Sequence, residues 1–232
     1  MTRTMPSGLF VTGTDTGVGK TYISCLLLHA LAARNMAVVG MKPIAAGCEN
    51  GQWRDVELLR FASNVDVPLD DLNPYALQTP IAPHIAARQE GVTIKIAYIG
   101  QCYDRLARNA ELVIVEGAGG LLVPINTYET TIDLVRTLNL PVMLVVGMRL
   151  GCINHALLTA QAIKHAGLCL VGWVANCVDP GMLALEENIA ALQHRIDAPL
   201  LGQIPFTETS DLTQQVQRIE VDKLIQIIGQ GD

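Results

Sequence analysis

Short runs of apolar, often β-branched residues alternate along this chain with longer segments in which apolar positions recur every three or four residues. A run of the first kind is typical of a buried strand, and a segment of the second kind is typical of an amphipathic helix. The predicted strands cover residues 9–12, 37–41, 112–115, 141–146, 170–175 and 200–204. Helical spacing connects Ile23, Leu27, Ala30 and Leu31, then Leu185, Ile189, Leu192 and Ile196, and finally Val221, Leu224, Ile225 and Ile228. This order predicts an α/β fold, with a mainly parallel β-sheet flanked by helices on both faces.

The composition agrees with such a fold. Of the 232 residues, 50% are hydrophobic and 16% are charged, which excludes an intrinsically disordered chain. Aromatic residues make up only 4%, so the core consists mainly of aliphatic side chains, as in parallel sheets covered on both faces. No repeat or low-complexity linker divides the sequence, and we expect a single domain over residues 1–232. Residues 47–83 are rich in Gly, Pro, Asp and Asn, and we expect one long irregular stretch there.

Charge and cysteine content narrow the class of protein. The chain has 16 basic and 22 acidic residues, a net charge of −6, and no basic run, so we expect no nucleic-acid partner. The apolar run from Leu140 to Met148 is too short to span a membrane, and the segment after Arg3 lacks the apolar centre of a secretory signal. The six cysteines form no Cys-x-x-Cys pair, and we expect reduced thiols in a cytoplasmic protein.

The residues after the first predicted strand have the composition of a phosphate-binding loop. Gly13 to Thr21 reads GTDTGVGKT and runs directly into a predicted helix. Glycines let backbone N–H groups surround a phosphate at the positive end of the helix dipole, while Lys20 reaches the terminal phosphates and Thr21 can ligate Mg²⁺. Gly13 precedes Gly19 by one residue more than in the usual motif, whose first position here is Thr14. A plain glycine-rich turn is the alternative, but Lys20 and Thr21 at a helix start favour the P-loop.

Three further charged residues are candidates for the same site. Glu116 ends a predicted buried strand at the edge where open α/β sheets bind ligands, and it could hold Mg²⁺; the alternative is a solvated charge at a strand end. Asp55 is a second candidate metal ligand, but on its own it is as readily the N-cap of a helix. Lys42 follows the second strand and could neutralise charge on a transferred phosphoryl group, with a surface lysine as the alternative.

Taken together, these motifs resemble the dethiobiotin synthetase family, ATP-dependent enzymes of biotin synthesis in the P-loop NTPase superfamily. The resemblance rests on residues 12–21 (TGTDTGVGKT), 42–43 (KP), 115–120 (VEGAGG), 145–156 (with GCINH at 151–155) and 172–176 (GWVAN). These segments span most of the chain. A P-loop alone would indicate only the superfamily, whereas the long-spaced loop, the EGAGG strand end and the GCINH segment in this order are specific to the family.

The resemblance implies a reaction that needs no nucleophilic side chain. In that family CO₂ adds to the 7-amino group of 7,8-diaminononanoate, ATP phosphorylates the carbamate, and the 8-amine closes the ureido ring with loss of phosphate. Positioning and charge neutralisation would supply the catalysis. The resemblance further implies Mg²⁺ as the cofactor, ATP as the co-substrate and a homodimer with shared sites.

The same resemblance assigns residues to roles. Lys20, Lys42 and Thr16 would contact the carbamate and the γ-phosphate. The Mg²⁺ ligands would be Thr21, Asp55 and Glu116. The nucleotide would also contact Gly17, Val18, Gly19, Tyr22, Gly117, Ala118, Gly119, Asn176, Pro205, Phe206 and Thr207. The diamine would also contact Ala46, Leu150, Gly151 and Asn154, the last three across the dimer interface.

Some positions depart from the family pattern. Ala46 stands where the family often has a serine close to the substrate, so that hydroxyl is missing here. Where some members place a tyrosine against the substrate carboxylate, this chain has Glu186, Glu187 and Asn188, and an acidic residue there would repel the carboxylate. Asp211 lies near the family's acidic contact to the ribose or adenine.

Two other classes share the phosphate loop. Regulatory ATPases of the partitioning and cell-division type carry a signature lysine five residues before the P-loop lysine, where this chain has Asp15. Amidases of the cobyrinic acid type append a glutamine-hydrolysing domain, for which 232 residues leave no room. The synthetase is therefore the favoured interpretation.

Overall fold

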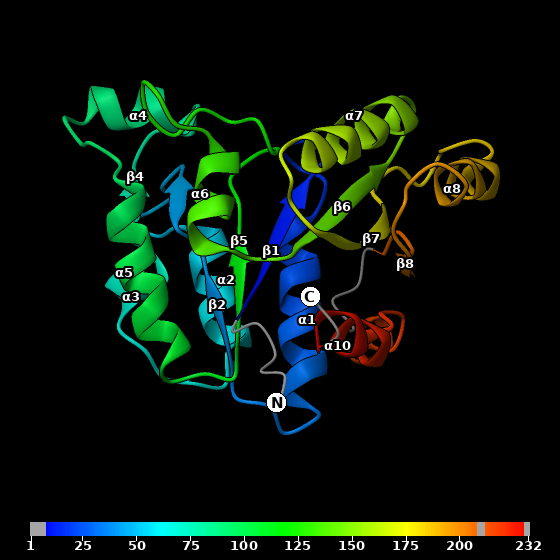
Figure 1. Cartoon of the computed structure of the whole chain (residues 1–232), viewed down its shortest axis with the longest axis horizontal. Coiled ribbons are helices and arrows are strands. Elements are labelled where there is room, and N and C mark those ends of the chain that lie inside the picture. Colours follow the sequence, from blue (N-terminus) through cyan, green and yellow to red (C-terminus); the bar gives the residue numbers. More distant parts are fainter. Residues whose placement is uncertain (1–7, 208–211, 230–232) are drawn as a thin grey trace.

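A computed structural model describes residues 8–207 and 212–229, and its centre is a six-stranded parallel sheet (Figure 1). The strand order is β2-β5-β1-β6-β7-β8. The strands are β1 (Gly8–Gly13), β2 (Val38–Met41), β5 (Leu112–Glu116), β6 (Val142–Met148), β7 (Leu170–Cys177) and β8 (Leu200–Ile204). All six predicted strands are therefore present, and the predicted α/β class is confirmed. Within the described ranges, no helix is long and apolar enough to cross a membrane.

Helices cover both faces of this sheet because alternate strand residues point to opposite sides. Leu9 and Val11 of β1 pack in one cluster with α1 (Lys20–Ala32) and α10 (Val221–Gly229), whereas Phe10 packs on the other side. The side of Phe10 is covered by α5 (Ile96–Ala107) and α6 (Thr131–Leu138), and further along by α7 (Cys152–His165) and α8 (Leu185–Gln193). A short helix, α9 (Leu212–Val216), precedes α10.

The prediction of one long irregular stretch over residues 47–83 was wrong. This part of the chain contains α2 (Arg54–Ala62), α3 (Leu69–Leu72) and β4 (Tyr75–Leu77), and β4 pairs in parallel with β3 (Ile44–Ala46). A further helix, α4 (Pro83–Gln89), follows. Each of these helices and strands is short and buries only a few apolar side chains. The regular spacing of its apolar positions is therefore hard to recognise among the Gly and Pro residues. Ile196 likewise lies beyond the end of α8, although its side chain is buried.

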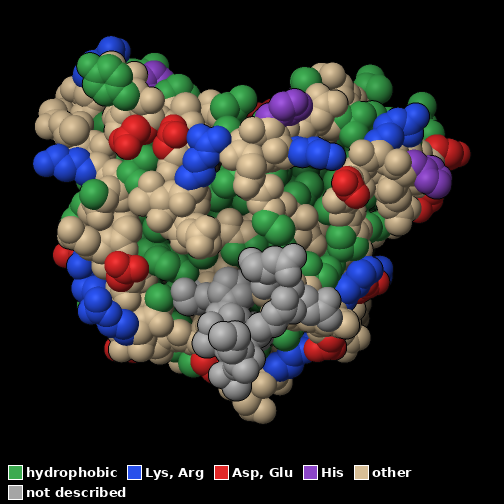
Figure 2. Space-filling model, viewed as in Figure 1, with side chains coloured by type: hydrophobic (Ala, Val, Ile, Leu, Met, Phe, Trp, Pro, Cys, Tyr) green, Lys and Arg blue, Asp and Glu red, His purple; other side chains and the backbone are tan. Residues whose placement is uncertain are grey.

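The parallel strands bring their carboxyl ends to one edge of the sheet. Val11 of β1 is paired with Glu116 of β5, and Met41 of β2 is paired with Val115. Lys42 and Glu116 therefore leave adjacent strands at the same level. Figure 2 shows a notch in the molecule at this edge, between the part formed by α4 and the part formed by α7.

Candidate nucleotide and substrate site

The P-loop connects β1 to α1 through two residues in the left-handed backbone region. Gly17 has a φ of 73° and Gly19, the N-cap of α1, has a φ of 89°. A Cβ at Gly19 would also overlap the side-chain amide nitrogen of Asn176. The position therefore requires glycine for two reasons: the backbone angle and the close approach of Asn176.

The buried side chain of Val18 anchors the P-loop against strand β6. Its side chain is fully buried and packs into space left open by Gly147 of β6, where a Cβ would come within 2.8 Å of the Val18 Cγ1 atom. The amide of Asn176 donates to the Val18 carbonyl at 2.9 Å, and Thr14 N donates to the Val145 carbonyl at 3.0 Å. Only the backbone of Val18 can therefore face a phosphate.

Lys20 begins α1 and is almost completely buried, with 7% of its surface exposed. Its ammonium group donates to the backbone carbonyl of Asp15 at 2.9 Å, so the side chain folds back over its own loop. Burial, and secondly the charge of Lys42, lower the pKa of Lys20 to about 8. The side chain is thus held where a phosphate oxygen could take the place of the Asp15 carbonyl.

Lys42 lies deeper, with 4% of its surface exposed, so the surface-lysine alternative is wrong. Its Nζ atom donates to Glu116 Oε1 at 2.5 Å and to Asp55 Oδ2 at 2.8 Å. Burial by itself would lower the pKa of Lys42, but the charges of Glu116 and Asp55 outweigh it and raise that pKa. Lys42 is therefore a charged group at the centre of the site.

The carboxylates come from two different elements. Glu116, at the end of β5, is fully buried, so it is not a solvated charge at a strand end. Asp55 is the second residue of α2 and does not cap that helix, whose N-cap residue is Trp53. Burial would raise the pKa of Asp55, but Lys42 lowers it overall. Asp55 and Glu116 therefore form a cluster of charged side chains with Lys42.

The oxygen atoms of Thr21, Asp55 and Glu116 are suitable ligands for Mg²⁺. The Thr21 hydroxyl donates to Glu116 Oε1 at 2.8 Å, and Glu116 Oε2 is buried without a hydrogen-bond partner among the described residues. A buried carboxylate oxygen with no partner is costly, and a cation would satisfy it. Mg²⁺ commonly takes one or two carboxylates and completes its shell with waters and phosphate oxygens, so Thr21, Asp55 and Glu116 are a suitable set.

The structure reveals a residue that the sequence did not single out. Asn73 is buried, and its amide nitrogen donates to the Lys42 carbonyl at 2.6 Å and to the Tyr75 carbonyl at 3.3 Å. On the same segment Leu72 accepts from Lys42 N at 2.8 Å. Asn73 therefore fixes the backbone from which the Lys42 side chain projects. The only sequence signal was its position in an Asn-Pro turn dipeptide.

The two lysines, the two carboxylates, Thr21 and residues of the P-loop line one cavity of about 690 Å³. Of the predicted residues it contains Thr16, Gly17, Gly19, Lys20, Thr21, Lys42, Ala46, Asp55, Glu116, Ala118 and Gly119. One wall of the cavity was not predicted from the sequence. It consists of apolar residues: Ile44, Pro80, Ile81, Ala82, Pro83 and Val123. The Pro and Gly content of this segment had indicated only an irregular connection. The cavity thus has a charged floor and an aliphatic wall.

Other predicted residues lie around the cavity or away from it. The side chain of Asn176 reaches the P-loop. Asn176 is also paired with Ile204 on the neighbouring strand β8, so residues 205–207, which follow Ile204, lie beside it. Tyr22 lies on α1 and packs against the core, and Gly117 donates its N–H to the Val11 carbonyl. Asp211 falls outside the described residues.

The residues predicted to contact the diamine across an interface do not reach the cavity of their own chain. Leu150 is 97% exposed, Gly151 caps α7 with a φ of 93°, and Asn154 is exposed on the first turn of α7. Large apolar side chains of Leu122 and Tyr128 are also exposed on the segment after β5. These positions are available to a second molecule.

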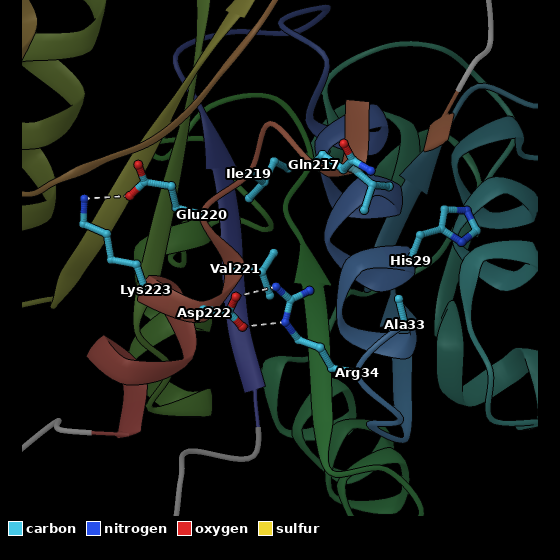
Figure 3. Close-up of a pocket in the computed structure, with 10 residues that line it drawn as sticks. His29, Ala33, Arg34, Gln217, Ile219, Glu220, Val221, Asp222 and Lys223 are labelled. Atoms are coloured by element: carbon cyan, nitrogen blue, oxygen red, sulfur yellow. Dashed lines mark hydrogen bonds and ion pairs between the residues drawn. The ribbon is translucent and has the colours of Figure 1, made fainter. Parts of the chain in front are cut away.

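A second cavity, of about 990 Å³, lies at the opposite end of α1 (Figure 3). The 13 residues of α1 separate the two ends by about 20 Å. The charged groups in this cavity pair with one another: Arg34 donates to Asp222 at 2.6 and 2.7 Å, and Lys223 to Glu220 at 2.8 Å. None of the residues predicted for the site lines it. The chemistry is therefore concentrated in the cavity at the P-loop.

Comparison with known proteins agrees with the site. An AAA domain family model matches residues 7–214. The ATP-dependent dethiobiotin synthetase BioD of Nitrosospira multiformis is 55% identical over 220 residues, covering 95% of this chain and 97% of the relative. The protein of the same name from Aromatoleum aromaticum is 53% identical over 215 residues, covering 91% and 96%.

Solved structures give a more distant likeness. The MinD cell division protein of Aquifex aeolicus superimposes with a TM-score of 0.55 at 15% identity, covering 97% of this chain and 98% of that one. The signal recognition particle receptor FtsY of Elizabethkingia anophelis gives a TM-score of 0.56 at 15% identity, covering 97% and 66%. At this identity the likeness shows a shared fold and does not favour a regulatory ATPase. Sequence relatives that are more than half identical over nearly the whole chain decide the assignment, and this chain belongs to the family of ATP-dependent dethiobiotin synthetases.

Proposed function

We propose that the protein is an ATP- and Mg²⁺-dependent ligase that converts 7,8-diaminononanoate and CO₂ into dethiobiotin, releasing ADP and phosphate, in biotin biosynthesis. One observation carries the proposal: the buried ammonium groups of Lys20 and Lys42 line a single cavity with two carboxylates and the P-loop. Such a cavity suits a reaction between two anions, because it neutralises charge on both. The relatives, which are ATP-dependent dethiobiotin synthetases, agree with this chemistry.

The reaction then proceeds in three steps. CO₂ adds to the 7-amino group and gives a carbamate, with loss of a proton from nitrogen. A carbamate oxygen attacks the γ-phosphorus of ATP, and ADP leaves, which gives a carbamic-phosphoric anhydride. The 8-amino group attacks the carbonyl carbon and loses a proton, the C–O bond to phosphate breaks so that phosphate leaves, and the ureido ring closes. Lys20, Lys42 and Thr16 hold the anionic oxygens in line during the phosphoryl transfer.

Thr21, Asp55 and Glu116 would hold Mg²⁺, which supplies charge neutralisation for the nucleotide phosphates. The backbone from Gly17 to Tyr22 surrounds the phosphates. Since the Asn176 amide nitrogen is engaged by Val18, its oxygen is the atom that would accept from the adenine amine. Pro205, Phe206 and Thr207 complete the base pocket, and residues 117–119 close the site beside the phosphates.

The diamine chain lies along the aliphatic wall near Ala46. In the proposed homodimer, Leu150, Gly151 and Asn154 of each subunit reach the substrate of the other. The exposure of Leu150, Leu122 and Tyr128 supports such an interface, since large apolar side chains on a surface mark sites of association. The six free cysteines suit the reducing cytoplasm, where we propose that the enzyme works.

Measurement of phosphate release by the purified protein tests the proposal. Phosphate should appear only when ATP, Mg²⁺, 7,8-diaminononanoate and bicarbonate are all present, and in equal amount to dethiobiotin measured by mass spectrometry. Omission of the diamine is the critical control. Equal phosphate release without it would contradict the proposal and indicate a nucleotide-driven switch.

A further inference from the structure

Most of the aliphatic wall of the cavity belongs to one stiff segment of the chain. Residues 78–82 connect β4 to α4, which lies above β4 in Figure 1. Pro80 and Pro83 each fix their own φ angle and favour an extended or polyproline-like backbone in the residue before them. Ala82, before Pro83, has a φ of −54° and a ψ of 132°. The wall is therefore stiff along its length, and its place in the cavity depends on how the segment is attached.

The first attachment is to the residues that follow β3. Gly47 N donates to the Leu77 carbonyl at 3.1 Å, and Cys48 N donates to the Gln78 carbonyl at 2.8 Å. Gly47, whose φ is 97°, also lies against Pro80, because a Cβ on Gly47 would come within 3.0 Å of the Pro80 Cβ atom. These contacts hold one side of the segment.

The second attachment is a single carboxylate. Glu90, the C-cap residue of α4, accepts with Oε1 from Gln78 N at 2.8 Å and from Thr79 N at 3.4 Å. Hydrogen bonds to a charged acceptor are stronger than those between neutral groups. The carboxylate thus closes residues 78–90 into one loop, in which the wall is connected to both ends of α4.

The Glu90 bonds lie outside the packed core. Ala86 and Ala87 of α4 are buried in the same hydrophobic cluster as residues of β3 and β4, so α4 is seated on that strand pair by packing. Gln78, in contrast, is exposed, and its N–H could bond to water if the carboxylate were removed. Loss of the Glu90 bonds should therefore loosen the wall locally while the fold remains.

We infer that Glu90 is a positioning residue for the diamine, because its carboxylate holds the aliphatic wall in place from outside the cavity. Glu90 is not among the described residues that line the cavity, so it acts through residues 80–83. The inference rests on the proposed function, in which the diamine chain lies along this wall. A wall that is already ordered favours binding of an aliphatic chain, since ordering it on binding would cost free energy.

Hydrogen exchange followed by mass spectrometry tests the attachment in the protein without substrates. In Glu90→Ala, the amides of residues 78–82 should exchange at least about tenfold faster than in wild type. Glu90→Gln keeps a side-chain oxygen as acceptor and should stay close to wild type. Glu111→Ala is the matched control, because it removes a 2.7 Å bond from a backbone N–H, that of Ala37, to a carboxylate at the other end of the sheet. Unchanged exchange of residues 78–82 in Glu90→Ala would overturn the inference.

Steady-state kinetics test whether the wall serves the diamine. Glu90→Ala should raise the KM for the diamine about tenfold, while kcat and the KM for ATP stay within about twofold of wild type, because contacts along the wall are lost equally in the ground state and the transition state. Glu90→Gln should restore most of the affinity. An unchanged diamine KM despite faster exchange of the wall would refute the positioning role, and so would an equal rise in the KM for ATP.

A second variant covers a folding defect. If Glu90→Ala does not fold, Glu90→Asp replaces it in both experiments, since its shorter side chain withdraws the carboxylate from the backbone N–H groups. Failure of the wild type to form dethiobiotin would contradict the proposed function, whereas hydrogen exchange tests the attachment without any turnover. The two failures are therefore distinguishable.

Discussion

The side-chain amide of Asn73 donates a 2.6 Å hydrogen bond to the backbone carbonyl of Lys42, 31 residues earlier in the chain. The bond connects the turn before β4 to the end of β2, and the parallel pairing of β3 with β4 extends the connection. Lys42 has a long side chain with many rotamers, so its ammonium group is placed accurately only if its backbone is fixed. Asn73 is thus a positioning residue for the site.

Asn73→Ala should lower kcat about 10- to 100-fold, because a lost hydrogen bond in a buried position costs about 1–3 kcal/mol and here displaces Lys42. The KM for ATP should change much less. Steady-state kinetics and the melting temperature separate this effect from unfolding. Asn109→Ala removes a similar amide-to-carbonyl bond, to Arg105 on the exposed side of α5, and is the control. A kcat within twofold of wild type for Asn73→Ala would refute the positioning role.

Lys20→Ala and Lys42→Ala should each reduce turnover by several powers of ten, corresponding to about 3–6 kcal/mol of transition-state stabilisation. Removal of Lys42 also leaves two carboxylates without their cation, which costs about 3–5 kcal/mol of folding free energy. Thermal denaturation must therefore accompany the kinetics, and Lys42→Gln serves if the alanine variant is unstable. Near-normal turnover of either folded variant would remove that lysine from the proposed site.

Gly147→Ala should weaken ATP binding about tenfold or more, since overpacking of a buried site typically costs about 1–3 kcal/mol. The new Cβ would lie 2.8 Å from Val18 Cγ1, and relief of that contact moves the P-loop. Gly100→Ala is the control, because a Cβ there meets no atom within 4 Å and the site is in α5. Calorimetric titration of both variants with ATP is the measurement. Unchanged affinity in Gly147→Ala would mean that Val18 does not fix the loop.

Mixed dimers test whether the site is shared between subunits. In the proposed homodimer, Lys42→Ala would damage the cavity of its own subunit, whereas Asn154→Ala would damage the contribution to the other subunit. Refolding an equal mixture of the two inactive variants should restore about a quarter of wild-type activity, because half the dimers are mixed and each has one intact site. Activity no higher than that of the separate variants would contradict the shared site.

The sequence predicted the sheet and the P-loop well because both rest on local patterns. Leu112 to Val115 and the other buried strands are continuous apolar runs, and GVGKT at a strand-to-helix junction allows few alternatives. The region around Asn73 was not predictable in this way. The β3–β4 pair has only three residues in each strand, and the role of Asn73 depends on a pairing between distant segments. The wall at Pro80 to Pro83 likewise takes its meaning from the elements across the cavity.

The charged residues of the site were also only partly predictable from local sequence patterns. Taken alone in the sequence, Lys42 was better interpreted as a surface lysine, and Asp55 was equally well interpreted as a helix cap. Only the register of β2 and β5, together with the packing of α2 on α1 and β2, brings both to Glu116. Sequence pattern could name the groups, but their convergence is a tertiary property.

In the proposed reaction, the cavity joins the γ-phosphate of ATP to a carbamate made from CO₂. A reaction with freshly dissolved bicarbonate labelled with oxygen-18 tests it directly, with the products analysed by mass spectrometry before the label exchanges with water. If a carbamate oxygen attacks phosphorus, the released phosphate carries an oxygen-18 atom and its amount matches that of dethiobiotin. Dethiobiotin formed with unlabelled phosphate would contradict this reaction.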